Sequence, residues 1–233
     1  MYNTPQNYSG NTSSMAMAAS GVMKKVYMKM TFGLLVTALT AQACSVSKFY
    51  LTMFEANQWL MWLLFGAEFL IVISVSGAIT KMKSSTASLL FYLFALLNGL
   101  SLAPIFILFT PVSIAKTFFI TAGTFAAMSV YGYFTTKDLS RFGSILVMAL
   151  IGLIIASIVN IFAGSSTLDW IITFAGVIIF VGLTAWDTQK IKQWSEYATP
   201  EQYGHIATIG ALSLYLDFIN MFLYLLRLFG DRR

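Results

Sequence analysis

Two aspartates lie inside otherwise apolar stretches near the C-terminal end of the sequence. Asp187 belongs to FVGLTAWDTQKIKQW and Asp217 to LSLYLDFINMFLYLLRLFG. The loop between them contains Pro200 and Gly204, which places the centre of a turn near residue 202. Each aspartate is about 15 residues from that centre, and both arms of an antiparallel helical hairpin rise by about 1.5 Å per residue. The spacing therefore predicts that the two carboxylates lie at the same depth.

Such a pair could sense protons and bind cations. Two carboxylates within a few ångströms in a weakly screened site cannot both ionise cheaply, so they titrate as a unit near neutrality or below. Losing a shared proton leaves two like charges that must separate or recruit a cation. Hard cations such as Ca²⁺ prefer carboxylate oxygens, so Asp187 and Asp217 are candidate transient calcium ligands. Alternatively, they only join helices, through hydrogen bonds to each other or to Thr184, Thr188 and Asn220. Ionisable groups at such depth are more often functional.

The polar residues of the last apolar stretch share one helical face. They recur every three or four residues, which aligns them along a helix. A seam of small and polar residues is typical of a helix packed inside a bundle, so we expect the last helix to be central. Asn220 and Arg227 are thus candidates for a gate or ion pathway, and Glu68, a third acid in an apolar stretch, is either a pathway residue or a packing partner. The seam consists of Gly210, Ser213, Asp217, Asn220, Tyr224 and Arg227.

The segments that must position these residues are long and apolar. The 233-residue chain is 58% hydrophobic and 10% charged, with a mean hydropathy of +0.77, whereas soluble domains carry roughly 25% charged residues. A membrane-spanning helix needs about 20 mostly apolar residues. We therefore predict an all-α, polytopic membrane protein with seven transmembrane helices, the C-terminal one central. The expected spans cover residues 30–50, 58–79, 86–109, 114–134, 143–163, 168–190 and 207–229.

The remaining sequence features set the domain organisation and the orientation. Residues 1–22 are rich in Asn, Ser, Thr and Ala, so we expect a disordered tail, followed by one transmembrane domain over residues 23–233. Most Lys and Arg residues of the links fall on the side of the N-terminus, which predicts a cytoplasmic N-terminus. The net charge of +5 is interpreted as membrane orientation and anionic-lipid contact, not nucleic-acid binding. The single cysteine, Cys44, excludes a disulfide framework, and no pattern implies a cofactor.

Several stretches of the chain are specific when taken together. They are KKVYMKMTFGLLVTALTA, NGLSLAPIF, VYGYFTTKDLSRFG, GLTAWDTQKIK and ALSLYLDFINMFLYLLRLFG. In combination they resemble the Bax inhibitor-1 family of the TMBIM superfamily, including its bacterial YetJ and YccA branch, from about residue 24 to the end. The resemblance implies a bacterial inner-membrane protein with seven helices, the last surrounded by the other six. It also implies a pH-sensitive calcium leak, with paired aspartates that match Asp187 and Asp217.

One position departs from the pattern of that family. Members similar to YetJ use an arginine in the second helix to hold the aspartate pair closed, and the stretch EFLIVISVSGAITKMKSS contains none. Lys81 is the nearest cation, and a lysine lacks the two-pronged geometry of arginine. A closing contact made by Lys81 is therefore only a hypothesis, whereas the aspartate pair does not depend on it.

Three classes of function follow. The leading hypothesis is a non-enzymatic cation leak channel or slow transporter, for Ca²⁺, controlled by protons at Asp187 and Asp217. The alternative is a membrane interaction protein that modulates a membrane protease or a stress response. Intramembrane aspartyl proteases also pair aspartates, but they carry a Gly-x-Gly-Asp stretch and a later Pro-Ala-Leu motif. Here Asp217 follows Leu-Tyr-Leu and no proline comes after it, which disfavours proteolysis.

Overall fold

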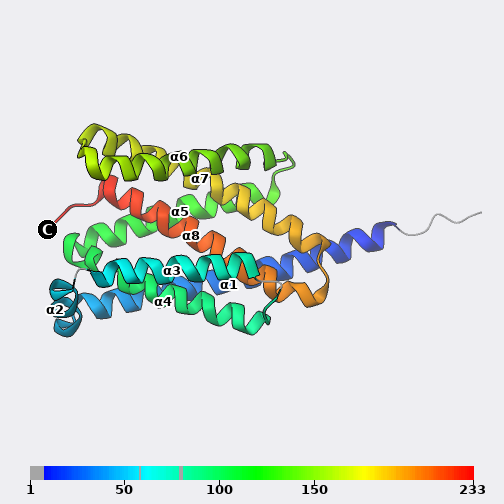
Figure 1. Ribbon diagram of the computed structural model, residues 1–233. Coiled ribbons are helices and arrows are strands. Elements are labelled where there is room, and N and C mark those ends of the chain that lie inside the picture. Colours follow the sequence, from blue (N-terminus) through cyan, green and yellow to red (C-terminus); the bar gives the residue numbers. More distant parts are fainter. Residues whose placement is uncertain (1–7, 58, 79–80) are drawn as a thin grey trace, which may run out of the picture.

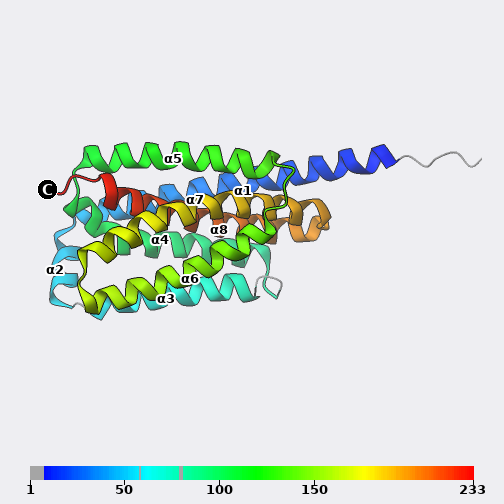
Figure 2. The ribbon, with the colours of Figure 1, turned by 90° about the horizontal axis from the view of Figure 1, so that it is seen from above.

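Long helices that run roughly along one axis make up the described part of the chain (Figures 1 and 2). The computed structural model describes residues 8–57, 59–78 and 81–233. These residues form no sheet, which confirms the all-α class. The helices are α1 (Tyr8–Ser45), α2 (Lys48–Ala56), α3 (Trp59–Ala78), α4 (Ser84–Leu108), α5 (Pro111–Phe134), α6 (Ser140–Ala163), α7 (Ser166–Tyr197) and α8 (Tyr203–Phe229), with a 3₁₀ turn at Pro200–Gln202.

Six helices of the described residues, α3 to α8, are long and apolar enough to cross a membrane. They correspond to the last six predicted spans, although residues 58 and 79, at the edges of one span, lie outside the described residues. The remaining predicted span, the first in the chain at residues 30–50, is not confirmed. It falls within α1 and the short helix α2, and α1 is not among the six because threonines, Lys29 and Gln42 interrupt its apolar residues.

A disordered tail was expected through residue 22, whereas the structure describes residues 8–22 as the first part of α1, which begins at Tyr8. Residues 1–7 of the expected tail lie outside the described residues. Ala19 and Val22 are each only 1% exposed, so the helix is packed before the first predicted span begins. The start of α1 continues beyond the end of the bundle (Figure 1). Apolar residues between the small polar ones therefore extend the helix further than composition suggests.

The last helix, α8, occupies the middle of the bundle. It packs against α1, α4, α5 and α7, and it is the most buried of the six candidate spans. In Figure 1 it runs between α6 and α7 on one side and α1, α3 and α4 on the other. Leu214, Tyr215 and Met221 of α8 are fully buried. This agrees with the central position expected from its polar seam.

A glycine brings α5 close to α7, next to the first candidate aspartate. A Cβ atom added to Gly132 of α5 would lie 2.1 Å from the carbonyl oxygen of Ala185 in α7. That oxygen belongs to the backbone, which cannot turn aside as a flexible side chain can. Any larger residue at position 132 would therefore push α5 away from α7, two residues before Asp187.

Candidate functional site: an aspartate pair between α7 and α8

The two candidate aspartates lie in the interface between α7 and α8. Asp187 comes from α7 and Asp217 from α8, and these helices pack against each other. Asp187 is 9% exposed and Asp217 is 4% exposed. The side chain of Asp187 is close enough to act electrostatically on Asp217. The structure thus brings together the two carboxylates that the sequence singles out.

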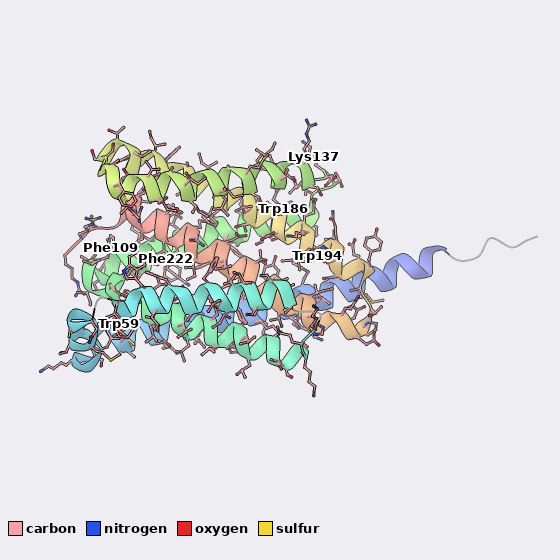
Figure 3. The ribbon with its side chains drawn as sticks, viewed as in Figure 1. Trp59, Phe109, Lys137, Trp186, Trp194 and Phe222 are labelled. Atoms are coloured by element: carbon pink, nitrogen blue, oxygen red, sulfur yellow. The ribbon has the colours of Figure 1, made fainter. Side chains whose placement is uncertain are left out.

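A lysine that the sequence analysis did not assign to the site accompanies the pair. Lys190 Nζ lies 3.8 Å from Asp187 Oδ1, one helical turn further along α7, and its charge also acts on Asp217. The same ammonium group lies 4.4 Å from the ring centroid of Trp186 and 4.8 Å from that of Trp194 (both tryptophans are labelled in Figure 3). The spacing of three residues between Asp187 and Lys190 is a signal for such a pair.

One carboxylate oxygen of the pair lacks a partner. Asp217 Oδ2 is buried and accepts no hydrogen bond from any of the described residues. Nearby side chains that could donate a hydrogen bond to this oxygen donate to other acceptors instead. The hydroxyl of Thr184 donates to the Phe180 carbonyl and the amide of Asn220 to the Leu216 carbonyl, both at 2.8 Å. A buried acceptor without a donor costs about 1–3 kcal/mol, so the site is incomplete as it stands.

The third neighbour, Thr188, also turns away from the aspartates. Its hydroxyl lies 2.8 Å from the Thr184 carbonyl and 3.5 Å from the Ser129 hydroxyl of α5. The interpretation of Asp217 as a residue held by Thr184, Thr188 and Asn220 therefore has no support from the hydrogen bonds of the described residues. The seam residues of α8 do face α7, but they do not saturate the carboxylate.

A polar cavity opens from the C-terminal end of α8 toward the pair. It has a volume of about 430 Å³ and reaches Asn220 and Tyr224, so it comes within one helical turn of Asp217. Arg227 lies at its outer end, 3.4 Å from Asp169 of α7, and both of these side chains are about half exposed. The candidate pathway residues Asn220 and Arg227 thus share this cavity.

A second, wider cavity lies at the opposite end, where α7 joins α8. It has a volume of about 910 Å³, reaches Ile209 of α8, and is lined by Glu196 and Glu201. Ile209 precedes Asp217 by about two helical turns. The aspartate pair therefore lies between two openings, one lined by two glutamates and the other by one aspartate, which is paired with Arg227.

The third intramembrane acid, Glu68, lies in a different part of the bundle. Its carboxylate accepts hydrogen bonds from the Ser101 hydroxyl at 2.5 Å and from the Asn98 amide at 3.2 Å, both of α4. The hydroxyl of Tyr215, in α8, donates to Asn98 Oδ1 at 3.0 Å and lies 2.6 Å from the hydroxyl of Thr37 in α1. Glu68 is thus part of a polar network that joins four helices, which favours its interpretation as a packing residue.

Lys81 lies apart from the aspartate pair. It is exposed in the turn between α3 and α4, and it takes part in none of the ion pairs formed by the described residues. The cation beside Asp187 is Lys190 instead. Among the described residues, no group of three or more His, Cys, Asp or Glu side chains gathers as a metal site would, so the pair offers only a two-carboxylate contact.

Comparisons with known proteins agree on one family. Residues 19–233 match the family described as "Inhibitor of apoptosis-promoting Bax1". The inner membrane protein YbhL of Escherichia coli strain K12 is 47% identical over 214 residues, which cover 91% of this chain and 92% of YbhL. A protein of Borreliella burgdorferi is 45% identical over 213 residues, covering 91% of this chain and 92% of the relative. The protein RP147 of Rickettsia prowazekii is 43% identical over 213 residues, covering 91% and 89%.

Proposed function

The chain belongs to the Bax inhibitor-1 family, and on that basis we propose that it is a pH-sensitive cation leak channel or slow transporter gated by Asp187 and Asp217. Ca²⁺ is the ion that we assign to it. The observation that carries the proposal is the buried Asp217 Oδ2 without a partner. A proton or a cation can satisfy this oxygen, and both arrive from outside the protein.

The charge state of the pair controls the gate. With a proton present, one carboxyl group donates to the other and the α7–α8 interface stays closed. After the proton leaves, two negative charges in a weakly screened interface repel each other and attract a cation. Lys190, 3.8 Å from Asp187, competes with the incoming cation for the ionised carboxylate. Its contact weakens the binding of the ion, which a leak requires because the ion must also depart.

The two cavities give the cation its route. Glu196 and Glu201 line the entrance near the α7–α8 turn, and Asp169 lies at the other end. Carboxylates in a cavity wall raise the local concentration of cations. Glu201 takes part in none of the ion pairs of the described residues, whereas Glu196 pairs with Lys192 and Asp169 with Arg227. Movement of α8 relative to α7 would join the cavities at the level of Asp217.

The same proposal fixes the membrane arrangement. Seven crossings result when α1 spans the bilayer beside α4 and α8, against which it packs. The basic residues near the start of α1 and in the turn after α3 then lie on one side, which we assign to the cytoplasm. The membrane is the bacterial inner membrane, as in the name of the relative YbhL. We assign no enzymatic activity.

Calcium flux into vesicles tests the proposal. Purified protein is reconstituted in liposomes that contain a calcium dye, and flux is measured from about pH 5 to about pH 8. We expect flux that changes with pH in the unmodified protein and flux without pH dependence in Asp217→Asn. Glu68→Gln is the matched control, because it changes a buried acid that already has partners. Flux that is equal at every pH in the unmodified protein would reject the mechanism.

A second function has one feature in its favour. The start of α1 continues beyond the bundle (Figure 1), and Met17 in this segment is 69% exposed. Such an extension could contact another membrane protein, such as a membrane protease. Deleting residues 2–16 spares the buried Ala19 and Val22, so the bundle should remain folded. Loss of a protease-inhibiting effect with an unchanged leak would assign that role to the extension.

A further inference from the structure

A groove between α1 and α5 forms one side of the bundle. Both helices pack on α7 and α8, yet two cavities separate them from each other. Figure 2 shows α1 and α5 running along the same side. The residues of α1 that line the two cavities are spaced along one helical face. Residues of α8 form part of the floor of one of these cavities. In a membrane protein such a groove opens sideways toward lipid.

The two ends of this groove differ in chemistry. The cavity near the start of α1, with a volume of about 770 Å³, is lined by Lys24 and Tyr27 of α1 and by Ser129 and Tyr133 of α5. The cavity at the other end, about 400 Å³, is almost entirely apolar and includes Phe222 (labelled in Figure 3). The groove is therefore amphipathic, with its cation at one end.

The basic end is available for a ligand. Lys24 is exposed and takes part in none of the three ion pairs found in the described part of the chain. Below it the walls become apolar, with Met23 of α1 and with Ala126 and Val130 of α5. Phe218 of α8 closes this stretch, and its ring centroid lies 5.5 Å from that of Phe125. A ligand would need a negative head and an apolar tail.

We propose that this groove binds an anionic phospholipid. The phosphate lies at Lys24, and one acyl chain follows the apolar wall to Phe218. Lys24 and Leu34, which lines the other cavity, are ten residues apart along α1, about 15 Å. This is half of the roughly 30 Å hydrocarbon core of a bilayer, the depth that one acyl chain occupies. The chain would end beside Phe218, the neighbour of Asp217.

Native mass spectrometry with added phosphatidylglycerol, and with phosphatidylcholine as the uncharged comparison, tests the head of the site. The unmodified protein should retain phosphatidylglycerol more tightly than phosphatidylcholine. Lys24→Gln should lower the affinity for phosphatidylglycerol about fivefold, the effect of one basic residue at an anionic membrane surface. Lys48→Gln, which removes an exposed lysine of α2, should leave it unchanged.

A second pair of variants tests the tail. Ala126→Trp fills the groove, whereas Ala127→Trp places the same bulk on an exposed neighbour that lines neither cavity. We expect Ala126→Trp to displace the bound lipid and Ala127→Trp to retain it. The readout is bound lipid, so the result does not depend on calcium flux. Equal retention of both lipids, equal losses in Lys24→Gln and Lys48→Gln, or unchanged binding in Ala126→Trp would each overturn the proposal.

Discussion

Two buried acidic sites lie in the same bundle, and they differ in how their oxygens are satisfied. Glu68 accepts hydrogen bonds from Ser101 and Asn98, and the network continues to Tyr215. Asp217, also buried, has an oxygen that none of the described residues satisfies, and a second carboxylate acts on it. The first site is complete within the protein. The second is complete only when a proton or a cation is added.

In the function proposed above, this difference separates a structural acid from a switch. In a low-dielectric interior an unsatisfied polar group is costly, so a proton or an ion that satisfies it shifts the balance between conformations. At Glu68 such a ligand would gain little, because donors are already present. At Asp217 the same ligand removes a penalty of about 1–3 kcal/mol, enough to change a population roughly fivefold to 150-fold.

The largest effect should come from Gly132→Ala, which disturbs only the aspartate side of the comparison. The new Cβ would lie 2.1 Å from the Ala185 carbonyl and force α5 away from α7. We expect a loss of about 3 kcal/mol in unfolding free energy, together with an altered pH response of flux. Gly123→Ala is the matched control, because an added Cβ there has no neighbour within 4 Å. Thermal unfolding in detergent distinguishes the two variants, and equal stability would refute the tight α5–α7 contact.

Asn98→Ala should have the next largest effect on stability, because it disturbs the hydrogen bonds around Glu68. It removes the amide that joins Glu68 to Tyr215, which leaves both without one partner. We expect about 2 kcal/mol of destabilisation, with the pH dependence of flux preserved. In the control Asn220→Ala the lost donor serves only the carbonyl of its own helix, so the cost should be lower. Unfolding in a denaturant series measures both losses, and a smaller loss in Asn98→Ala would contradict the network.

Tyr215→Phe should cost less, because it keeps the aromatic ring and removes only the hydroxyl. The ring stays packed against Phe91 and Phe94, whose centroids lie 5.8 and 5.7 Å away. We expect a loss of about 1 kcal/mol, the net contribution of a typical hydrogen bond. The melting temperature, compared with that of Tyr203→Phe near the α7–α8 turn, measures it. An unchanged melting temperature would mean that the hydroxyl contributes nothing to the bundle.

Of these variants, Lys190→Gln should change the stability of the protein least. Its main effect should be on the pH dependence of flux. The pair with Asp187 is about one-third exposed on the lysine side, so its loss should cost less than about 1 kcal/mol. Without the cation the ionised carboxylate is less stable, so the midpoint of the pH response should move to higher pH. Lys192→Gln, which changes a lysine paired with Glu196, is the control. Flux profiles with the same midpoint in both variants would remove Lys190 from the gate.

Much of this arrangement can be predicted from the sequence, because the residues along each helix reflect which of its faces are buried. The polar seam of α8 predicted its central position in the bundle. The turn near residue 202 predicted that Asp187 and Asp217 lie at the same depth. The apolar runs predicted the ends of α3 to α8 within a few residues, except that α7 continues to Tyr197, seven residues beyond its predicted span. Each of these features depends on local spacing, which a sequence contains directly.

Other features could not be predicted from the sequence, because they depend on contacts between segments that are distant in the chain. The hydrogen bonds of Glu68 come from α4 and continue to Tyr215 and Thr37, none of which is close in sequence. The polar start of α1 concealed a packed helix, because only the side that bears Ala19 and Val22 is buried. The spacing of three residues between Asp187 and Lys190 does indicate an ion pair, whereas Lys81 lies in the turn after α3.

The most direct test of the aspartate pair is infrared spectroscopy of the protonated carboxyl groups. Difference spectra are recorded from about pH 5 to about pH 8 for the unmodified protein, Asp217→Asn and Glu68→Gln. We expect a carboxyl band that titrates over this range in the unmodified protein and in Glu68→Gln, and that is absent from Asp217→Asn. A band that titrates in Asp217→Asn as it does in the unmodified protein, or that disappears in Glu68→Gln, would show that the proton does not depend on Asp217 and would contradict the assignment of the switch to the pair of Asp187 and Asp217.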